Sequence, residues 1–225
     1  FGFGAHIQVR SYVDAQPLEN AASLQSTLQS TPGVASAAPV IEEVVLLRQS
    51  ERSIDGVQLL GTTRAPEYLT QNLTRGSFQL EDSSAENAPL VVGAGLASRL
   101  GLAVGDRVTA FSLRDGGSGG GLQLGRPRVR QFRVTGVFET GLYQYDTKFT
   151  YTSLEAAQDF LGMGSSVTGV EFDVRDPWQA KAVADSLSRS LGFPYQVDDW
   201  QNQNQSLFSA LKLEKLAMTI ILLLI

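Results

Sequence analysis

Three arginines within five residues are the side chains of this sequence best suited to contact a partner. They are Arg126, Arg128 and Arg130, separated by Pro127 and Val129. Arginine forms charge-assisted hydrogen bonds with carboxylates, and an open strand edge beside it offers backbone pairing. The segment is therefore a candidate docking arm. Charge and proline also protect an exposed strand edge from aggregation, so a purely structural role is the alternative.

The residue types that enzymes use in catalysis are sparse. His6 is the single histidine, and it falls in a predicted strand, where a structural role is expected. The absence of cysteine excludes a thiol nucleophile, a disulfide and a cysteine-type zinc site. No G-x-x-x-x-G-K-[ST] pattern occurs, so the chain does not bind ATP through a P-loop. We therefore predict no catalytic residues, no metal site and no cofactor.

Two further motifs resemble functional ones but fit structural roles better. Gly93-Ala94-Gly95 follows a predicted strand and opens a helix, yet Ser98 stands where a dinucleotide-binding motif needs glycine or alanine. We interpret it as a tight turn. Asp198 and Asp199 are adjacent on a predicted strand and should point to opposite faces. We interpret them as a solvated strand end and not as a shared acid site.

The last ten residues, 216–225, carry no charge and read LAMTIILLLI. A bilayer-spanning helix needs about 20 apolar residues, so this run is half of one. The simplest interpretation is that the chain comes from a larger membrane protein and ends a few residues into a transmembrane helix. The N-terminus would then follow another membrane span. A C-terminal helix packed into a core is the alternative.

The rest of the composition is that of an ordinary soluble globular region. Charged residues make up 18% and hydrophobic residues 43% of the 225 residues. This length suits one large domain or two small ones. The net charge of −5 argues against nucleic-acid binding, which usually relies on a basic surface.

A β-α-β pattern occurs near each end of the chain. At the start, hydrophobic alternation predicts strands at 5–13, 34–49 (broken near Pro39) and 53–60, with a helix at 18–28. Towards the end it predicts a strand at 167–174, a helix at 176–191 and a strand beginning at 195–197. Between them we expect strands at 90–92, 106–113, 130–140 and 148–152, and helices at 94–100 and 154–161.

These patterns predict an α+β protein with a ferredoxin-like layer made of two split β-α-β halves. We place the first half at 5–60 and the second half at 166–205. An inserted β-rich subdomain occupies 61–165, and a hairpin at 112–131 with a glycine-rich tip projects from it. A helix at 206–225 follows the second half and begins a transmembrane segment.

Several short stretches, in a fixed order, resemble one family. They are GAHIQV at 4–9, VVGAGLA at 91–97, LGLAVGDRV at 100–108, VTGVF at 134–138, YQYD at 143–146, VTGVE at 167–171, DW at 199–200 and LFSALKLEK at 207–215. In this respect the chain is similar to the periplasmic domain of the LolC/LolE permease subunits of lipoprotein-releasing ABC transporters. These belong to the wider group of MacB and FtsX-like permeases.

The resemblance implies an architecture. Each permease of this family has four transmembrane helices, with a large periplasmic domain between the first and the second. That domain combines a porter-like part, here 5–60 and 166–205, with an inserted β-rich part called the sabre, here 61–165. The subunit is not an enzyme, because ATP hydrolysis belongs to a separate subunit.

The resemblance also implies partners and a location. They are a LolD-type ATPase, a second LolC/LolE-type permease or another copy of the chain, a lipoprotein substrate, a LolA-type periplasmic chaperone and membrane lipids. The protein would lie in the bacterial inner membrane, with this domain in the periplasm. In the LolC type a hairpin called the hook grips the chaperone. The matching hairpin here carries Arg126, Pro127, Arg128 and Arg130.

A helix running from 207 to 225 would join the periplasmic part to the membrane part. Leu213, Glu214 and Lys215 would lie near the membrane boundary and carry ATP-driven motion between the two. Three alternatives remain open: a MacB-like efflux or mechanotransmission permease that docks an adaptor protein, a soluble extracytoplasmic enzyme, and a structural scaffold. Whether the permease is LolC-like, LolE-like or a single form with both roles is also open.

Overall fold

The computed structural model describes residues 5–13, 16–19, 21–51, 53–80, 88–112, 127–203 and 205–224. Nineteen elements follow one another along the chain: β1 (Ile7–Ser11), α1 (Ala21–Gln29), β2 (Val34–Ser50), β3 (Ser53–Thr62), α2 (Glu67–Gln71), β4 (Leu73–Gly76), β5 (Ala88–Gly93), α3 (Ala94–Leu100), β6 (Arg107–Ser112), β7 (Arg128–Phe138), α4 (Tyr143–Lys148), β8 (Phe149–Ser153), α5 (Leu154–Leu161), β9 (Gly169–Val174), the 3-10 turn η1 (Pro177–Gln179), α6 (Ala180–Leu191), β10 (Tyr195–Asp199), α7 (Trp200–Gln203) and α8 (Gln205–Leu224).

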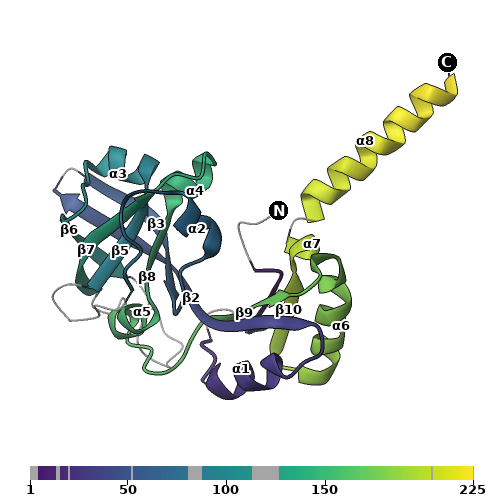
Figure 1. Cartoon of the computed structure of the whole chain (residues 1–225), viewed down its shortest axis with the longest axis horizontal. Helices are drawn as coiled ribbons and strands as arrows, with labels where there is room; N and C mark the ends of the chain where they lie inside the picture. Colours follow the sequence, from purple (N-terminus) through teal and green to yellow (C-terminus); the bar gives the residue numbers. More distant parts are fainter. Residues whose placement is uncertain are drawn as a thin grey trace.

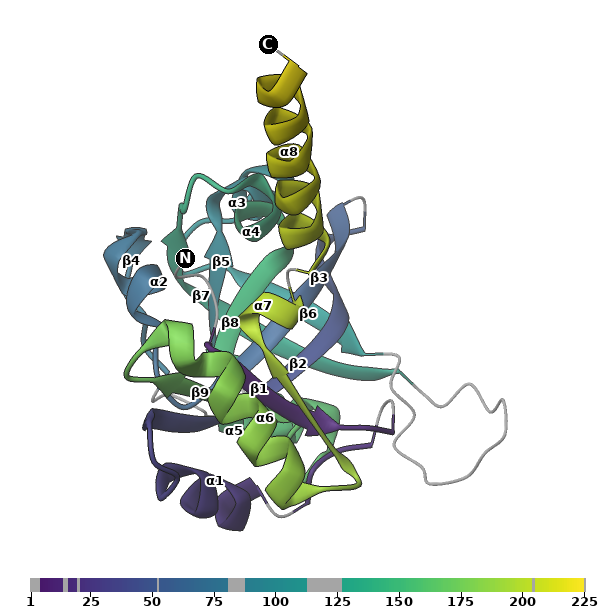
Figure 2. The same cartoon turned by 90° about the vertical axis from the view of Figure 1, so that its right-hand side faces the viewer.

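The two predicted β-α-β halves come together in one antiparallel layer. Its strand order is β10-β1-β9-β2, and every neighbouring pair is antiparallel. This is the order of a ferredoxin-like sheet, in which each half contributes one central and one outer strand. Helices α1 and α6 lie against one face of this layer (Figure 2). Their buried residues, among them Leu24, Leu28 and Leu187, share a core with Ile7 and Val9 of β1.

The segment between the halves forms a second, barrel-like sheet. The pairings run β2-β3-β8-β5-β7-β6 and return to β2, which closes a ring of six strands. The ring is mixed, because β3 pairs with β8 and β5 pairs with β7 in parallel. Phe132 and Leu59 are fully buried, and the ring of Phe160 on α5 packs edge-on against Phe132 at 5.7 Å. Strand β4 extends the sheet beyond β7.

Strand β2 belongs to both sheets. Residues 34–40 pair with β9, and residues 40–50 pair with β3. Figure 1 shows this strand running from the layer that carries α1 and α6 into the barrel. The predicted break near Pro39 is wrong, since the strand continues through it. Among the described strands only β9 pairs with residues 34–39 of β2, so the other edge carries no strand there and proline is tolerated.

Helix α4 was not predicted, and it explains the Gly93-Ala94-Gly95 motif. The start of α3 lies directly against α4: a Cβ atom on Gly93 would stand 2.6 Å from the carbonyl carbon of Asp146, and one on Gly95 would stand 2.6 Å from Cγ2 of Thr147. Glycine is therefore needed at these positions so that two helices can approach closely. The prediction had instead explained the glycines by a tight turn.

The interpretation of Asp198 and Asp199 as a solvated strand end is wrong for Asp199. Its side chain is fully buried. Oδ1 accepts hydrogen bonds from the backbone N–H groups of Gln201 and Asn202, at 2.8 and 3.1 Å, and Oδ2 accepts one from the Asn202 amide at 2.7 Å. Asp199 thus caps the first turn of α7, where unpaired N–H groups need an acceptor.

Helix α8 projects away from the rest of the molecule (Figures 1 and 2). The predicted helix at 206–225 is therefore present as Gln205–Leu224, and its apolar residues from Leu211 to Leu223 are largely exposed. Within the described part of the chain, no helix has the length and apolarity that crossing a bilayer requires. Entry of α8 into a membrane stays a prediction.

Candidate functional site

The predicted hairpin of 112–131 is only partly described. Strands β6 and β7 form its two arms and pair in antiparallel register, from Ser112 opposite Arg128 to Arg107 opposite Arg133. The glycine-rich tip and Arg126 lie outside the described residues. Pro127 is the first described residue of the return arm, and it is exposed. The role of this hairpin as a hook stays a prediction.

The two described arginines of the hairpin face helix α5. The guanidinium of Arg128 lies over Gly162, which caps the C-terminus of α5. Arg130 is more deeply placed, with 10% of its side chain exposed. Its Nη1 donates to the Ala156 carbonyl at 2.9 Å and lies 3.7 Å from Oδ2 of Asp159. Arg130 therefore holds α5 against β7, a contact within the chain.

The three residues predicted to couple the domain to the membrane lie in the middle of α8. Leu213, Glu214 and Lys215 are all exposed, and Leu213 has 69% of its surface accessible. The helix continues without interruption from Gln205 to Leu224 on both sides of them. An unbroken helix is the geometry that a rigid joint requires.

A cleft of about 500 Å³ lies between the ferredoxin-like layer and the barrel. One wall is the face of the layer opposite α1 and α6. There Gln8 and Arg10 alternate with the buried Ile7 and Val9 of the same strand. The other wall comes from β3, β8, α2, α4 and the loop after β3. The cleft thus brings together residues more than 100 positions apart in sequence.

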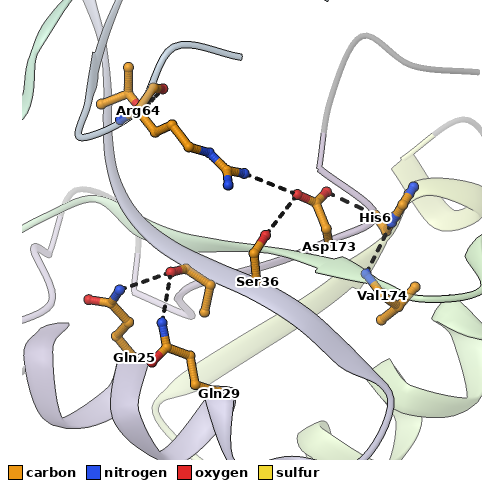
Figure 3. Close-up of polar contacts among 9 residues, drawn as sticks. His6, Gln25, Gln29, Ser36, Arg64, Asp173 and Val174 are labelled. Carbon is orange, nitrogen blue, oxygen red and sulfur yellow. Dashed lines mark hydrogen bonds and ion pairs between the residues drawn. The ribbon is translucent and has the colours of Figure 1, made fainter. Parts of the chain in front are cut away.

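Asp173 on β9 connects the two walls of the cleft (Figure 3). Its Oδ2 accepts a hydrogen bond from the Ser36 hydroxyl at 2.9 Å and lies 3.7 Å from Nη2 of Arg64, which follows β3. Its Oδ1 lies 3.8 Å from Nδ1 of His6. That nitrogen accepts a hydrogen bond from the backbone N–H of Val174 at 3.1 Å. His6 therefore fastens the beginning of β1 to β9, in line with its predicted structural role.

Glu171, also on β9, lines the cleft together with two charged residues that pair with each other. Arg10 of β1 reaches across the strand to pair with Glu42 of β2, and Gly169 beneath them leaves room for this contact. Among the described residues, Glu171 accepts a single side-chain hydrogen bond, a long one of 3.4 Å from the Gln8 amide. Burial and the nearby Glu42 raise the pKa of Glu171 to about 7, and the charge of Arg10 only partly opposes them.

The opposite wall of the cleft carries tyrosines. The hydroxyls of Tyr68 and Tyr151 are hydrogen-bonded at 2.7 Å, and the ring of Tyr145 stacks on Phe149 at 4.6 Å between centroids. Burial raises the pKa of Tyr68 to about 12 and raises that of Tyr145 as well. The charges of Glu42 and Glu171, which line the same cleft, contribute to the pKa shift at Tyr145 after burial. At neutral pH the tyrosines are uncharged hydrogen-bond donors.

Sequence analysis did not identify this cleft. Arg10, Glu42, Glu171 and Asp173 stand on strands β1, β2 and β9, whereas Arg64 and Glu67 come from the opposite wall. No local pattern reveals that these segments meet. A weak signal was present: polar Gln8, Arg10, Glu171 and Asp173 alternate with apolar residues in both central strands. Such alternation marks a sheet with one face outside the core. It does not show that another part of the chain lies opposite that face.

Comparison with known proteins agrees with this architecture. Residues 4–190 match the family described as "MacB-like periplasmic core domain". A LolC transmembrane protein of a lipoprotein-releasing system, from Xylella fastidiosa, is 34% identical over 197 residues, which cover 86% of this chain and 46% of that protein. A LolE protein from Haemophilus influenzae is 23% identical over 90% of this chain and 48% of its own length.

A solved structure supports the same fold. The periplasmic region of MacB from Actinobacillus actinomycetemcomitans superposes with a TM-score of 0.59 at 14% identity, covering 92% of this chain and 93% of that one. The ferredoxin-like layer with an inserted barrel is thus the fold that the periplasmic region of MacB also has. The chain belongs to the family of MacB-like periplasmic core domains. It is similar to LolC permeases and spans about half the length of these curated relatives.

Proposed function

We propose that this chain is the periplasmic domain of a LolC-like permease subunit. The subunit works in an inner-membrane ABC transporter that releases lipoproteins and passes them to a periplasmic chaperone of the LolA type. The observation that carries the proposal is the similarity to LolC over most of the chain, at a higher identity than to LolE. The likeness to MacB supports the fold alone and does not favour an efflux role.

In this proposal the domain is non-catalytic and acts by contact and by motion. A LolD-type subunit hydrolyses ATP, and a second permease of the LolC/LolE type completes the membrane part. The hairpin of β6 and β7 docks the chaperone, and α8 enters the membrane and meets its lipids. Arg126 and Arg128 supply charge-assisted hydrogen bonds to acidic groups of the chaperone, whereas Arg130 contacts α5 within the chain.

A pull-down with a LolA-type chaperone tests the docking role. We expect the chain to capture the chaperone and expect Arg126→Ala combined with Arg128→Ala to weaken capture at least about tenfold, since each charged hydrogen bond contributes roughly 1.5–3 kcal/mol. Arg130 is kept, because it holds α5 and its loss would disturb the fold. The matched control is Lys181→Ala with Arg189→Ala on α6, which should bind normally. Equal capture by both double variants would refute the docking role.

The coupling role of α8 is tested in the assembled transporter. Proline at position 213 removes one backbone hydrogen bond and clashes with the preceding turn, which costs about 3 kcal/mol and bends or breaks a helix. We expect Leu213→Pro to abolish lipoprotein release while ATP hydrolysis continues. Leu213→Ala preserves the helix and should release normally, because the side chain is exposed. Normal release by Leu213→Pro would show that α8 is not the joint.

A further inference from the structure

The cleft has an excess of negative charge. Arg10 forms an ion pair with Glu42, and Arg64 forms one with Asp173. Glu171 takes part in no ion pair within the described residues and receives only the long hydrogen bond from Gln8. Glu67 adds another carboxylate to the lining. The described residues that line the cleft include no lysine.

The wall opposite these carboxylates is aromatic. Tyr68, Tyr145, Phe149 and Tyr151 line it, and Glu171 and Glu42 line the other wall of the same cleft. Aromatic faces attract cations through their quadrupole, and desolvation strengthens the attraction. A carboxylate on one side and aromatic rings on the other are therefore complementary to a positively charged group with an alkyl stem.

We propose that this cleft is a binding site for a primary alkylammonium group, held between Glu171 and the tyrosine wall. The ammonium donates to Glu171, and its alkyl stem lies against Tyr145 and Tyr68. A volume of about 500 Å³ is in the range of ligand pockets and admits a lysine side chain with its neighbouring residues or a small amine. This inference is independent of the proposed lipoprotein transport.

Binding is linked to a proton on Glu171. The charged and titratable groups that face this residue or line the cleft around it are His6, Arg10, Glu42, Arg64, Glu67, Tyr68, Tyr145, Tyr151 and Asp173. Because the carboxyl is about half protonated near pH 7, an incoming cation displaces that proton. Affinity should therefore rise about tenfold from pH 6 to pH 8 and level off above that.

The probe is n-butylammonium, titrated into the 225-residue chain and followed by NMR shifts of the cleft residues. The uncharged alcohol 1-pentanol, whose chain is one methylene longer, and the peptide acetyl-Gly-Lys-Gly-amide are titrated in parallel. We expect both cations to bind and pentanol to bind at least about tenfold more weakly. Tighter binding of the peptide assigns the site to a lysine of a polypeptide, and equal affinity assigns it to a small amine. Failure of both cations to bind, or equal binding of pentanol, overturns the proposal.

Two variants and one control locate the site. Glu171→Gln should lower the affinity for n-butylammonium at pH 8 at least about tenfold and remove its pH dependence. Tyr145→Leu should lower affinity about threefold to tenfold without removing that dependence, since it deletes only the aromatic face. Glu51→Gln changes an exposed carboxylate outside the cleft and should bind as the original chain does. Unchanged affinity in Glu171→Gln refutes the assignment, whatever the outcome of the chaperone pull-down.

Discussion

Replacing Glu171 with glutamine should make the protein more stable at pH 8 and leave its stability nearly unchanged at pH 4. The pKa of this carboxyl is raised from 4.5 to about 7 in the folded chain, chiefly by burial. Between these two values the folded state binds more protons than the unfolded state, so stability falls as the pH rises. Glutamine retains the shape, has no charge to desolvate, and is free of this loss.

The size of the effect follows from the shift. At about 1.36 kcal/mol per pKa unit the full shift corresponds to roughly 3 kcal/mol, and partial exposure of Glu171 reduces it, so we expect about 1–2 kcal/mol. Urea unfolding of both proteins at pH 4, 6 and 8 measures it, with Glu51→Gln as the control. A stability difference that does not grow with pH would contradict the proposed environment of Glu171.

Adding one methyl group at Gly93 should destabilise the protein by about 3 kcal/mol. A Cβ atom there would stand 2.6 and 2.7 Å from the carbonyl carbon and Cα of Asp146, which are backbone atoms of α4. Backbone cannot swing aside as a long side chain can. The start of α3 and the whole of α4 would have to separate, and α4 carries the Tyr145 of the cleft.

Thermal unfolding of Gly93→Ala tests this contact. The matched control is Gly56→Ala on β3, where the added Cβ would meet only Cδ2 of Leu46, at an ordinary 3.8 Å. We expect the midpoint of Gly56→Ala to stay within a few degrees of the original and that of Gly93→Ala to fall well below it. Equal midpoints for the two variants would mean that α3 and α4 are not closely packed.

The local elements of this fold could largely be predicted from sequence, because each depends on the order of apolar residues within a short window. Alternation in β1 and β9 and the helical pattern of α6 are examples. Helix α4 escaped prediction because Tyr143–Lys148 is short and has no apolar periodicity. Pro39 suggested a break because proline usually interrupts a strand. It does not interrupt β2 because one edge of β2 carries no described strand there, and this depends on the assembled sheet and not on the local sequence.

The cleft could not be predicted, for a related reason. Glu171 owes its raised pKa chiefly to its burial in the folded chain and then to Glu42, 129 positions earlier. Arg130 also shows that a contact over a long sequence distance could not be predicted. Its position on a hairpin predicted a partner contact, whereas the structure directs its guanidinium to the Ala156 carbonyl. A charged residue in a sequence indicates that its side chain needs a polar partner. It does not indicate whether that partner lies in the same chain or in another protein.

The shared strand β2 has a mechanical consequence. Because one uninterrupted strand forms hydrogen bonds in both sheets, the ferredoxin-like layer and the barrel cannot swivel about a flexible linker at this point. A displacement delivered to the layer through α8 must either carry the barrel with it or bend β2 close to Val40, where its partner changes from β9 to β3. Bending there would alter the separation of the cleft walls, so the stiffness of β2 contributes to how far motion at one end of the molecule is felt at the other.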